Sequence, residues 1–144
     1  LTDVTGFGLA GHLFEMAKGG LVCMEIDTTS VPVIEEAWSL VEEGVVPSGA
    51  YRNMHSYGDS LRFDDEWNID HQLVFTDPQT NGGLLMSVAP EKAALFLNTL
   101  KEFGFEETAV IGHVRALKGT EAPVVFKRLH QAELANLPLA RADS

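Results

Sequence analysis

Cysteine is almost absent from this chain of 144 residues, since Cys23 is the only one. A framework of disulfides is therefore excluded, and so little cysteine is typical of a reducing compartment. Long apolar runs are also missing, because none approaches the roughly 20 residues that a membrane span needs. The start of the sequence shows no secretory leader, so the sequence predicts a cytoplasmic protein that does not bind membranes.

Basic residues are scarce: 10 lysines and arginines stand against 21 aspartates and glutamates, a formal net charge of −11. This acidic balance disfavours general binding to nucleic acids or acidic lipids. It does not exclude a small anion held by backbone amides or by a bound cation. The five histidines show no zinc-ligand spacing with one another or with Cys23, which is expected to be a packed residue.

Apolar residues recur at helical and strand-like spacings along much of the sequence. Hydrophobic residues make up 45% of the chain, enough for one domain over residues 1–144 with its own core. Helical spacing predicts helices at about 6–18, 32–44 and 90–104, and strand-like runs stand at 21–27, 84–88, 108–114 and 122–128. This order predicts an α+β fold, with helices packed on a mixed, largely antiparallel sheet. Residues 129–144 are expected to form a weak helix or a frayed end.

The opening stretch LTDVTGFGLAGH places Gly6, Gly8 and Gly11 at the spacing G-x-G-x-x-G, with Asp3 three residues earlier. A dinucleotide-binding loop is one interpretation, and Asp27 at the end of the next strand would then bind a ribose. Against it, no strand precedes the glycines and the second half does not continue as parallel βαβ units. Close helix packing, with Asp3 as a surface acid, is a second interpretation.

A metal–phosphate site is the third interpretation. The N-terminus of a helix offers free N–H groups and a partial positive charge, and glycine lets the backbone approach a phosphate. The carboxylate of Asp3 would repel that phosphate unless a hard cation lay between them. Because Mg²⁺ commonly takes one or two carboxylates together with phosphate oxygens, this pattern favours Asp3 as a Mg²⁺ ligand.

The stretches TDVTGFGLAGHLFEMA and DPQTNGGLL strongly resemble the selenophosphate synthetase (selenide, water dikinase) family of the aminoimidazole ribonucleotide synthetase superfamily. GAYRN at 49–53 and IGHV at 111–114 are similar to that family as well, so the likeness covers most of the chain. Members of the family usually carry Ser where this sequence has Asn81.

The resemblance implies the C-terminal domain of a longer, two-domain enzyme. That enzyme would convert ATP, selenide and water into selenophosphate, AMP and phosphate, and would form a homodimer. Its nucleophilic Cys or selenocysteine, the partner Lys and several Mg²⁺-binding aspartates belong to the family's N-terminal segment. We therefore expect that this chain was cut from a longer one, needs that N-terminal domain as partner, and is inactive by itself.

The resemblance also implies roles for particular positions of this sequence. Asp3 matches the metal-binding aspartate of the family's second domain, and Thr5, Gly6 and Gly8 would lie near the ATP phosphates. The remaining candidates are expected to shape the wall of the interdomain cleft: Thr80, Asn81, Gly82 and Gly83.

Several residues keep more than one interpretation. Arg52 and Asn53 could face the site or a domain interface, whereas His12 is expected to make a structural hydrogen bond. Trp38 and Trp67 are expected to pack in the core. The acidic residues near them are expected to form a solvated loop: Asp64, Asp65, Glu66 and Asp70. At the level of function, the alternatives are a purine-pathway ATP-dependent ligase of the same superfamily and a non-catalytic binding or regulatory module.

Overall fold

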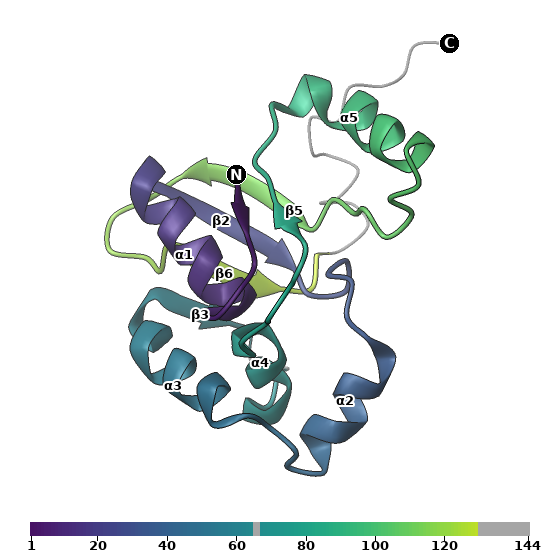
Figure 1. Cartoon of the computed structure of the whole chain (residues 1–144). Coiled ribbons are helices and arrows are strands. Elements are labelled where there is room, and N and C mark those ends of the chain that lie inside the picture. The colour runs from purple at the N-terminus through teal and green to yellow at the C-terminus, as the bar shows by residue number, and fades with distance from the viewer. Residues whose placement is uncertain (65–66, 130–144) are drawn as a thin grey trace.

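The computed structural model describes residues 1–64 and 67–129 (Figure 1). Its helices are α1 (Gly8–Gly20), α2 (Glu35–Glu42), α3 (Ser48–Tyr57), the 3-10 turn η1 (Gly58–Ser60), α4 (Ile69–Thr76) and α5 (Pro90–Glu102). Its strands are β1 (Thr2–Asp3), β2 (Val22–Asp27), β3 (Leu61–Phe63), β4 (Leu84–Leu85), β5 (Gly112–Ala116) and β6 (Val124–Lys127). No helix in these ranges is long and apolar enough to cross a membrane. Asp65, Glu66 and the predicted tail beyond Leu129 lie outside the described residues.

The main sheet has four strands in the order β3-β6-β2-β5. β2 runs antiparallel to β5 and parallel to β6, and β6 runs parallel to β3. A second, short sheet joins β1 to β4 in antiparallel fashion. The α+β fold with a mixed sheet is confirmed. The expectation that the sheet is largely antiparallel is wrong, because two of the three ladders described in the main sheet are parallel.

Strand β2 is buried on both faces, although apolar and polar residues alternate in its sequence, a pattern typical of a half-buried strand. Met24 and Ile26 join the core beneath α1, while Cys23 and Asp27 on the opposite face are 0% and 1% exposed. The alternation was misleading because the polar side chains of the second face are satisfied there by other protein groups rather than by water. The packed role expected for Cys23 is confirmed.

The core lies between the main sheet and α1 and α4, with α1 crossing in front of the sheet in Figure 1. Phe126 of β6 stacks on Phe63 of β3 at 4.6 Å and on Phe75 of α4 at 4.9 Å between ring centroids. Trp38 and Trp67 pack together at 5.8 Å, as expected. These aromatic contacts fasten α2 and α4 to the edge of the sheet formed by β3 and β6.

Several element boundaries differ from the sequence predictions. Helix α1 begins at Gly8 rather than Gly6 and ends after Gly20, where Leu21 adopts a left-handed conformation with φ of 53°. The predicted strand at 84–88 is shortened to β4. Between the predicted helix at 32–44 and that strand, the structure forms α3, β3 and α4, which are not among the elements predicted above. The sequences of these elements show little apolar periodicity. Their conformation is therefore determined by tertiary contacts rather than by a local pattern.

Helix α5 has the predicted span, and Gly104 follows it with φ of 90°, as expected of a glycine that ends a helix. None of its residues is buried, however. In Figure 1 the helix stands apart from the main sheet, beyond β5. Its apolar stripe therefore lines an open groove instead of completing the core.

On the face of the sheet opposite α1, Glu25 is the centre of a charged cluster. Its carboxylate accepts a hydrogen bond from Arg115 at 2.6 Å and lies 3.0 Å from Lys127 Nζ and 3.2 Å from His113 Nε2. Burial on its own would raise the pKa of Glu25. The hydrogen bonds from Arg115 and Lys127 outweigh burial and hold this pKa below its usual value.

We expect Glu25→Gln to lower the free energy of unfolding by about 1–3 kcal/mol at pH 7, because it removes charge-assisted hydrogen bonds. The folded pKa lies below the unfolded value of about 4.3, so the carboxylate stabilises the fold fully above that value. Its contribution is lost as the pH falls through the folded pKa. Denaturant titrations should therefore show that the difference in free energy of unfolding between the wild type and Glu25→Gln becomes smaller as the pH is lowered from 7 to 3.

The matched control for this experiment is Glu106→Gln, at an exposed position in the loop after α5. This variant should unfold like the wild type at both pH values. If the difference in free energy of unfolding between the wild type and Glu25→Gln became larger in acid, the role assigned to the cluster would be contradicted.

Candidate functional site

The two most distinctive motifs of the sequence meet in the small sheet. Thr2 is paired with Leu85 and Asp3 with Leu84. The pairing continues into the loops, because the Val4 N–H donates to the Gly83 carbonyl at 2.9 Å and the Gly82 N–H donates to the Val4 carbonyl at 3.1 Å. The first motif therefore lies directly beside DPQTNGGLL, as expected from the sequence.

Gly82 is required by this close approach. A Cβ atom at Gly82 would lie 2.5 Å from the Val4 carbonyl oxygen, which real side chains essentially never tolerate, and 3.1 Å from Val4 Cβ, which is a tight contact. At Gly83 a Cβ atom would meet nothing within 4 Å. The two adjacent glycines thus differ sharply in the space that they leave for a side chain.

Thr5 organises the turn that precedes α1. Its carbonyl accepts hydrogen bonds from the N–H groups of Gly8 and Gln79, both at 3.0 Å. The Thr5 N–H donates to His12 Nε2 at 3.0 Å, so this nitrogen is unprotonated and serves as an acceptor. The structural hydrogen bond expected of His12 is confirmed. The N-cap position of α1 belongs to Phe7, and no side chain caps this helix.

The glycines of the first motif have different surroundings. Gly8 has φ of 67°, and a Cβ atom there would lie 2.7 Å from the carbonyl carbon of Thr76. At Gly11 it would lie 2.8 Å from the ring of Tyr57. Close packing within the protein therefore accounts for these two glycines. Gly6 is exposed and a Cβ atom there would meet nothing, so it is the glycine that leaves its backbone open to a ligand.

The dinucleotide interpretation does not fit this arrangement. β1 pairs antiparallel with β4 and belongs to a different sheet from β2, so the two strands around α1 do not form a parallel βαβ unit. The Asp27 carboxylate, which would bind a ribose, already accepts hydrogen bonds from the Thr29 hydroxyl at 2.8 Å and from the Ser30 hydroxyl at 2.5 Å.

Asn53 joins α3 to the turn. Its Nδ2 donates to the Gly6 carbonyl and to the Thr76 carbonyl, both at 2.9 Å. Its neighbour Arg52 contacts Ser48 on the same helix. Sequence reasoning left both residues open, and their GAYRN motif was the signal that could have singled out Asn53.

Asp3 is exposed, and no cation of the described ranges lies within ion-pair distance of its carboxylate. The same ranges contain no group of three or more His, Cys, Asp or Glu residues that could hold a metal ion. A single carboxylate fits Mg²⁺ only as one ligand among phosphate oxygens and further groups. The donor chemistry of Asp3 thus suits a shared metal and not a metal bound by this domain alone.

Asp77 begins the second motif and directly follows α4. Its Oδ2 accepts a hydrogen bond from Gln79 Nε2 at 2.8 Å, whereas Oδ1 is buried and has no partner within the described chain. Burial raises the pKa of Asp77, and the hydrogen bond from Gln79 offsets only part of this. Among the described residues, one oxygen of this carboxyl group is therefore buried without a hydrogen bond.

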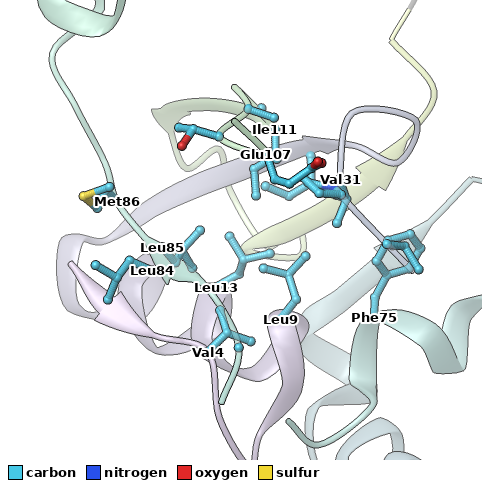
Figure 2. A pocket seen from close by; sticks show the side chains of 18 of the residues that line it. Val4, Leu9, Leu13, Val31, Phe75, Leu84, Leu85, Met86, Glu107 and Ile111 are labelled. Atoms are coloured by element: carbon cyan, nitrogen blue, oxygen red, sulfur yellow. The ribbon is translucent and has the colours of Figure 1, made fainter. Parts of the chain in front are cut away.

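A wide apolar groove of about 1850 Å³ lies next to the small sheet. Figure 2 shows Leu9, Leu13 and Leu85 on one side of it and Ile111 on the other. The stripe of α5 adds further apolar lining: Ala93, Phe96, Leu97 and Leu100. These mostly apolar walls do not suit a triphosphate, although Asp77 and Gln79 of the second motif also line the groove.

Residues 1–125 match the family model described as AIR synthase related protein, C-terminal domain. This chain belongs to that family. It is 41% identical to the selenide, water dikinase of Clostridioides difficile over an alignment of 114 residues. The aligned residues make up 79% of this chain and 33% of that protein. The corresponding enzyme of Aeromonas salmonicida is 41% identical over 121 residues, 84% of the chain and 34% of that protein.

The selenide, water dikinase of Citrifermentans bemidjiense is 42% identical over 125 residues, 87% of the chain and 35% of that protein. The chain thus spans about a third of the length of the curated relatives that it matches. The resemblance deduced from the motifs is confirmed at the level of the AIR synthase related C-terminal domain and of these relatives.

The close contact between the motifs can be tested by comparing Gly82→Ala with Gly83→Ala. We expect Gly82→Ala to push Val4 away and to lower the free energy of unfolding by about 1–3 kcal/mol, as overpacked positions do. Hydrogen exchange at the Val4 amide should accelerate in this variant. Gly83→Ala is the matched control and should leave both measurements unchanged. Equal exchange rates in the two variants would contradict the contact.

Proposed function

We propose that this chain is the C-terminal domain of a selenophosphate synthetase, which converts ATP, selenide and water into selenophosphate, AMP and phosphate. The observation that carries the proposal is the identity of about 41% to selenide, water dikinases over most of the chain. The meeting of the two family motifs at one polar turn supports it. ATP and selenide would be the substrates of a cytoplasmic, homodimeric two-domain enzyme.

Asp3 is the proposed metal-binding residue of this domain. It projects from β1 immediately before the turn, is exposed, and has no cation partner among the described residues. Mg²⁺ held between Asp3, the missing domain and the ATP phosphates would neutralise the phosphate charge that opposes phosphoryl transfer. The contribution of this chain would be to place one carboxylate at a fixed distance from the turn.

The turn from Thr5 to Gly8 is the proposed phosphate-binding segment. Gly8 already donates its N–H to Thr5, so it would shape the turn instead of binding phosphate itself. Within the described chain no hydrogen bond engages the N–H groups of Gly6 and Phe7, and no side chain caps the start of α1. These amides would be the donors for the phosphate oxygens, helped by the positive end of the helix dipole.

The turn from Thr80 to Gly83 is the proposed wall of the cleft towards the N-terminal domain. The side chains of Thr80 and Asn81 are exposed beside the first motif, while Gly82 and Gly83 hold the backbone against Val4. These residues would dock the missing domain or shape the cleft, and would take no part in the chemistry.

In the two-domain enzyme, we expect Asp3→Asn to reduce selenide-dependent AMP formation by about 100-fold or more, because the amide is a poor ligand for Mg²⁺. The melting temperature should stay near that of the wild type, since Asp3 is exposed. Asp59→Asn, the same change at another exposed position, is the control. If Asp3→Asn kept near-normal rates at limiting Mg²⁺, the proposed role of Asp3 as a Mg²⁺ ligand would be contradicted.

The chain by itself is expected to fold cooperatively but not to consume ATP, because the proposed nucleophile and most of the proposed Mg²⁺ ligands belong to the other domain. Purified chain should show a single unfolding transition and no release of AMP from ATP, with or without selenide. Robust selenide-dependent formation of AMP by this chain would refute the proposal that those groups lie outside it.

A further inference from the structure

We infer that Asn53 is a positioning residue that fixes the orientation of the Gly6–Phe7 peptide and thereby aims the Phe7 N–H at the phosphates of ATP. The inference rests on the proposed function. Its basis is the double hydrogen bond of Asn53 to the Gly6 and Thr76 carbonyls, each 2.9 Å long.

Both partners of Asn53 are carbonyl oxygens, so only the NH₂ end of the side chain can face them. Its two hydrogens serve two acceptors that secondary structure leaves free. Thr76 is the last residue of α4, where helical carbonyls lack internal partners, and Gly6 lies in the turn before α1. One amide group therefore links three segments that are distant in sequence.

Among the described residues, no other hydrogen bond holds the peptide that follows Gly6, although the ring of Phe7 packs against His12 and Tyr57. Gly6 is exposed, has no side chain, and has open space where a Cβ atom would lie. In a planar trans peptide the C=O and the next N–H point in opposite directions. By holding the Gly6 carbonyl, Asn53 also determines that the Phe7 N–H points away from α3.

The neighbouring contacts make Asn53 a rigid point of attachment. Thr76, its second acceptor, is fully buried and lies against Gly8, where a Cβ atom would approach its carbonyl carbon to 2.7 Å. The segment that follows Thr76 packs tightly against α3 as well, since a Cβ atom at Gly49 of α3 would lie 2.7 Å from Pro78. Packing thus places Asn53 independently of any ligand, as a preorganised binding site requires.

Asn53→Asp is the sharpest test, because it keeps the shape of the side chain but presents a carboxylate to two carbonyl oxygens. The Gly6 peptide should then turn away, and a phosphate would lose a charge-assisted hydrogen bond. In the two-domain enzyme, calorimetric titration should show about tenfold weaker binding of a non-hydrolysable ATP analogue with Mg²⁺. Kinetically, the KM for ATP should rise about tenfold while the KM for selenide stays unchanged.

Two further variants complete the experiment. Asn98→Asp is the matched control, since it makes the same change at an exposed position of α5, and it should bind the analogue like the wild type. Asn53→Ala removes the hydrogen bonds without adding charge. It should weaken binding less than Asn53→Asp, and it carries the test if the aspartate variant does not fold.

A purely structural role would give another result. A loosened fold reduces the fraction of active enzyme, so kcat would fall while both KM values and the affinity of the folded fraction stayed at wild-type levels. That result, or wild-type behaviour of the folded Asn53 variants, would overturn the inference. If wild-type enzyme neither binds the analogue nor forms AMP with selenide, the proposed function fails and the inference fails with it. An impaired Asp3→Asn enzyme beside unaffected Asn53 variants would overturn the inference alone.

Discussion

The close backbone contact between the first residues of the chain and the turn from Gln79 to Gly83 is the constraint on which the candidate site depends. Three main-chain hydrogen bonds, to Val4 and Thr5, hold the two segments together. They fix the direction of the chain after Asp3, where β1 ends, and the position at which α1 begins. Without them, the exposed N-terminal segment would have few buried contacts to keep it ordered.

A second set of contacts brings α3 and α4 to the same point. Gly8 approaches the end of α4 more closely than any side chain would allow, and Asn53 bonds to both sides of this junction. Two of the three glycines in the opening motif thus serve packing of the protein against itself. The third, Gly6, remains exposed, so only a small part of the motif is free for a ligand.

The candidate site borders the apolar groove, because Val4, Gln79 and Gly82 belong to the lining of the groove. The groove runs between α1 and the segment that carries α5, and Figure 2 shows aliphatic side chains along it. The polar turn lies at its edge, where Asp77 has one buried oxygen without a partner in the described chain. Polar groups of the second motif and apolar side chains of α5 therefore line the same groove.

The opposite face of the sheet shows how the same strand can serve two environments. Met24 and Ile26 of β2 contact the apolar core, whereas Glu25 and Asp27 between and beyond them are buried among donors. The charges of this face are compensated within the protein, and the pKa of Glu25 is held low for that reason. Buried carboxylates are tolerated only with such partners.

The sequence alone determined the α+β class, the span of α5, the strands β2 and β6, and the family, because these depend on local periodicity and on short motifs. It could not predict β3 or α4, whose sequences lack a clear period. It also could not assign Asn53, since the acceptors of that side chain are 47 and 23 residues away along the chain.

Only the tertiary structure decided which glycines of the opening motif are needed for packing and which one is exposed. A spacing of glycines records where a side chain is not tolerated, but not what approaches the backbone there. For Gly8 it is the end of α4, and for Gly82 it is the Val4 carbonyl. The physical reason is that such distances are set by chain segments far apart in sequence, which meet only when the domain has folded.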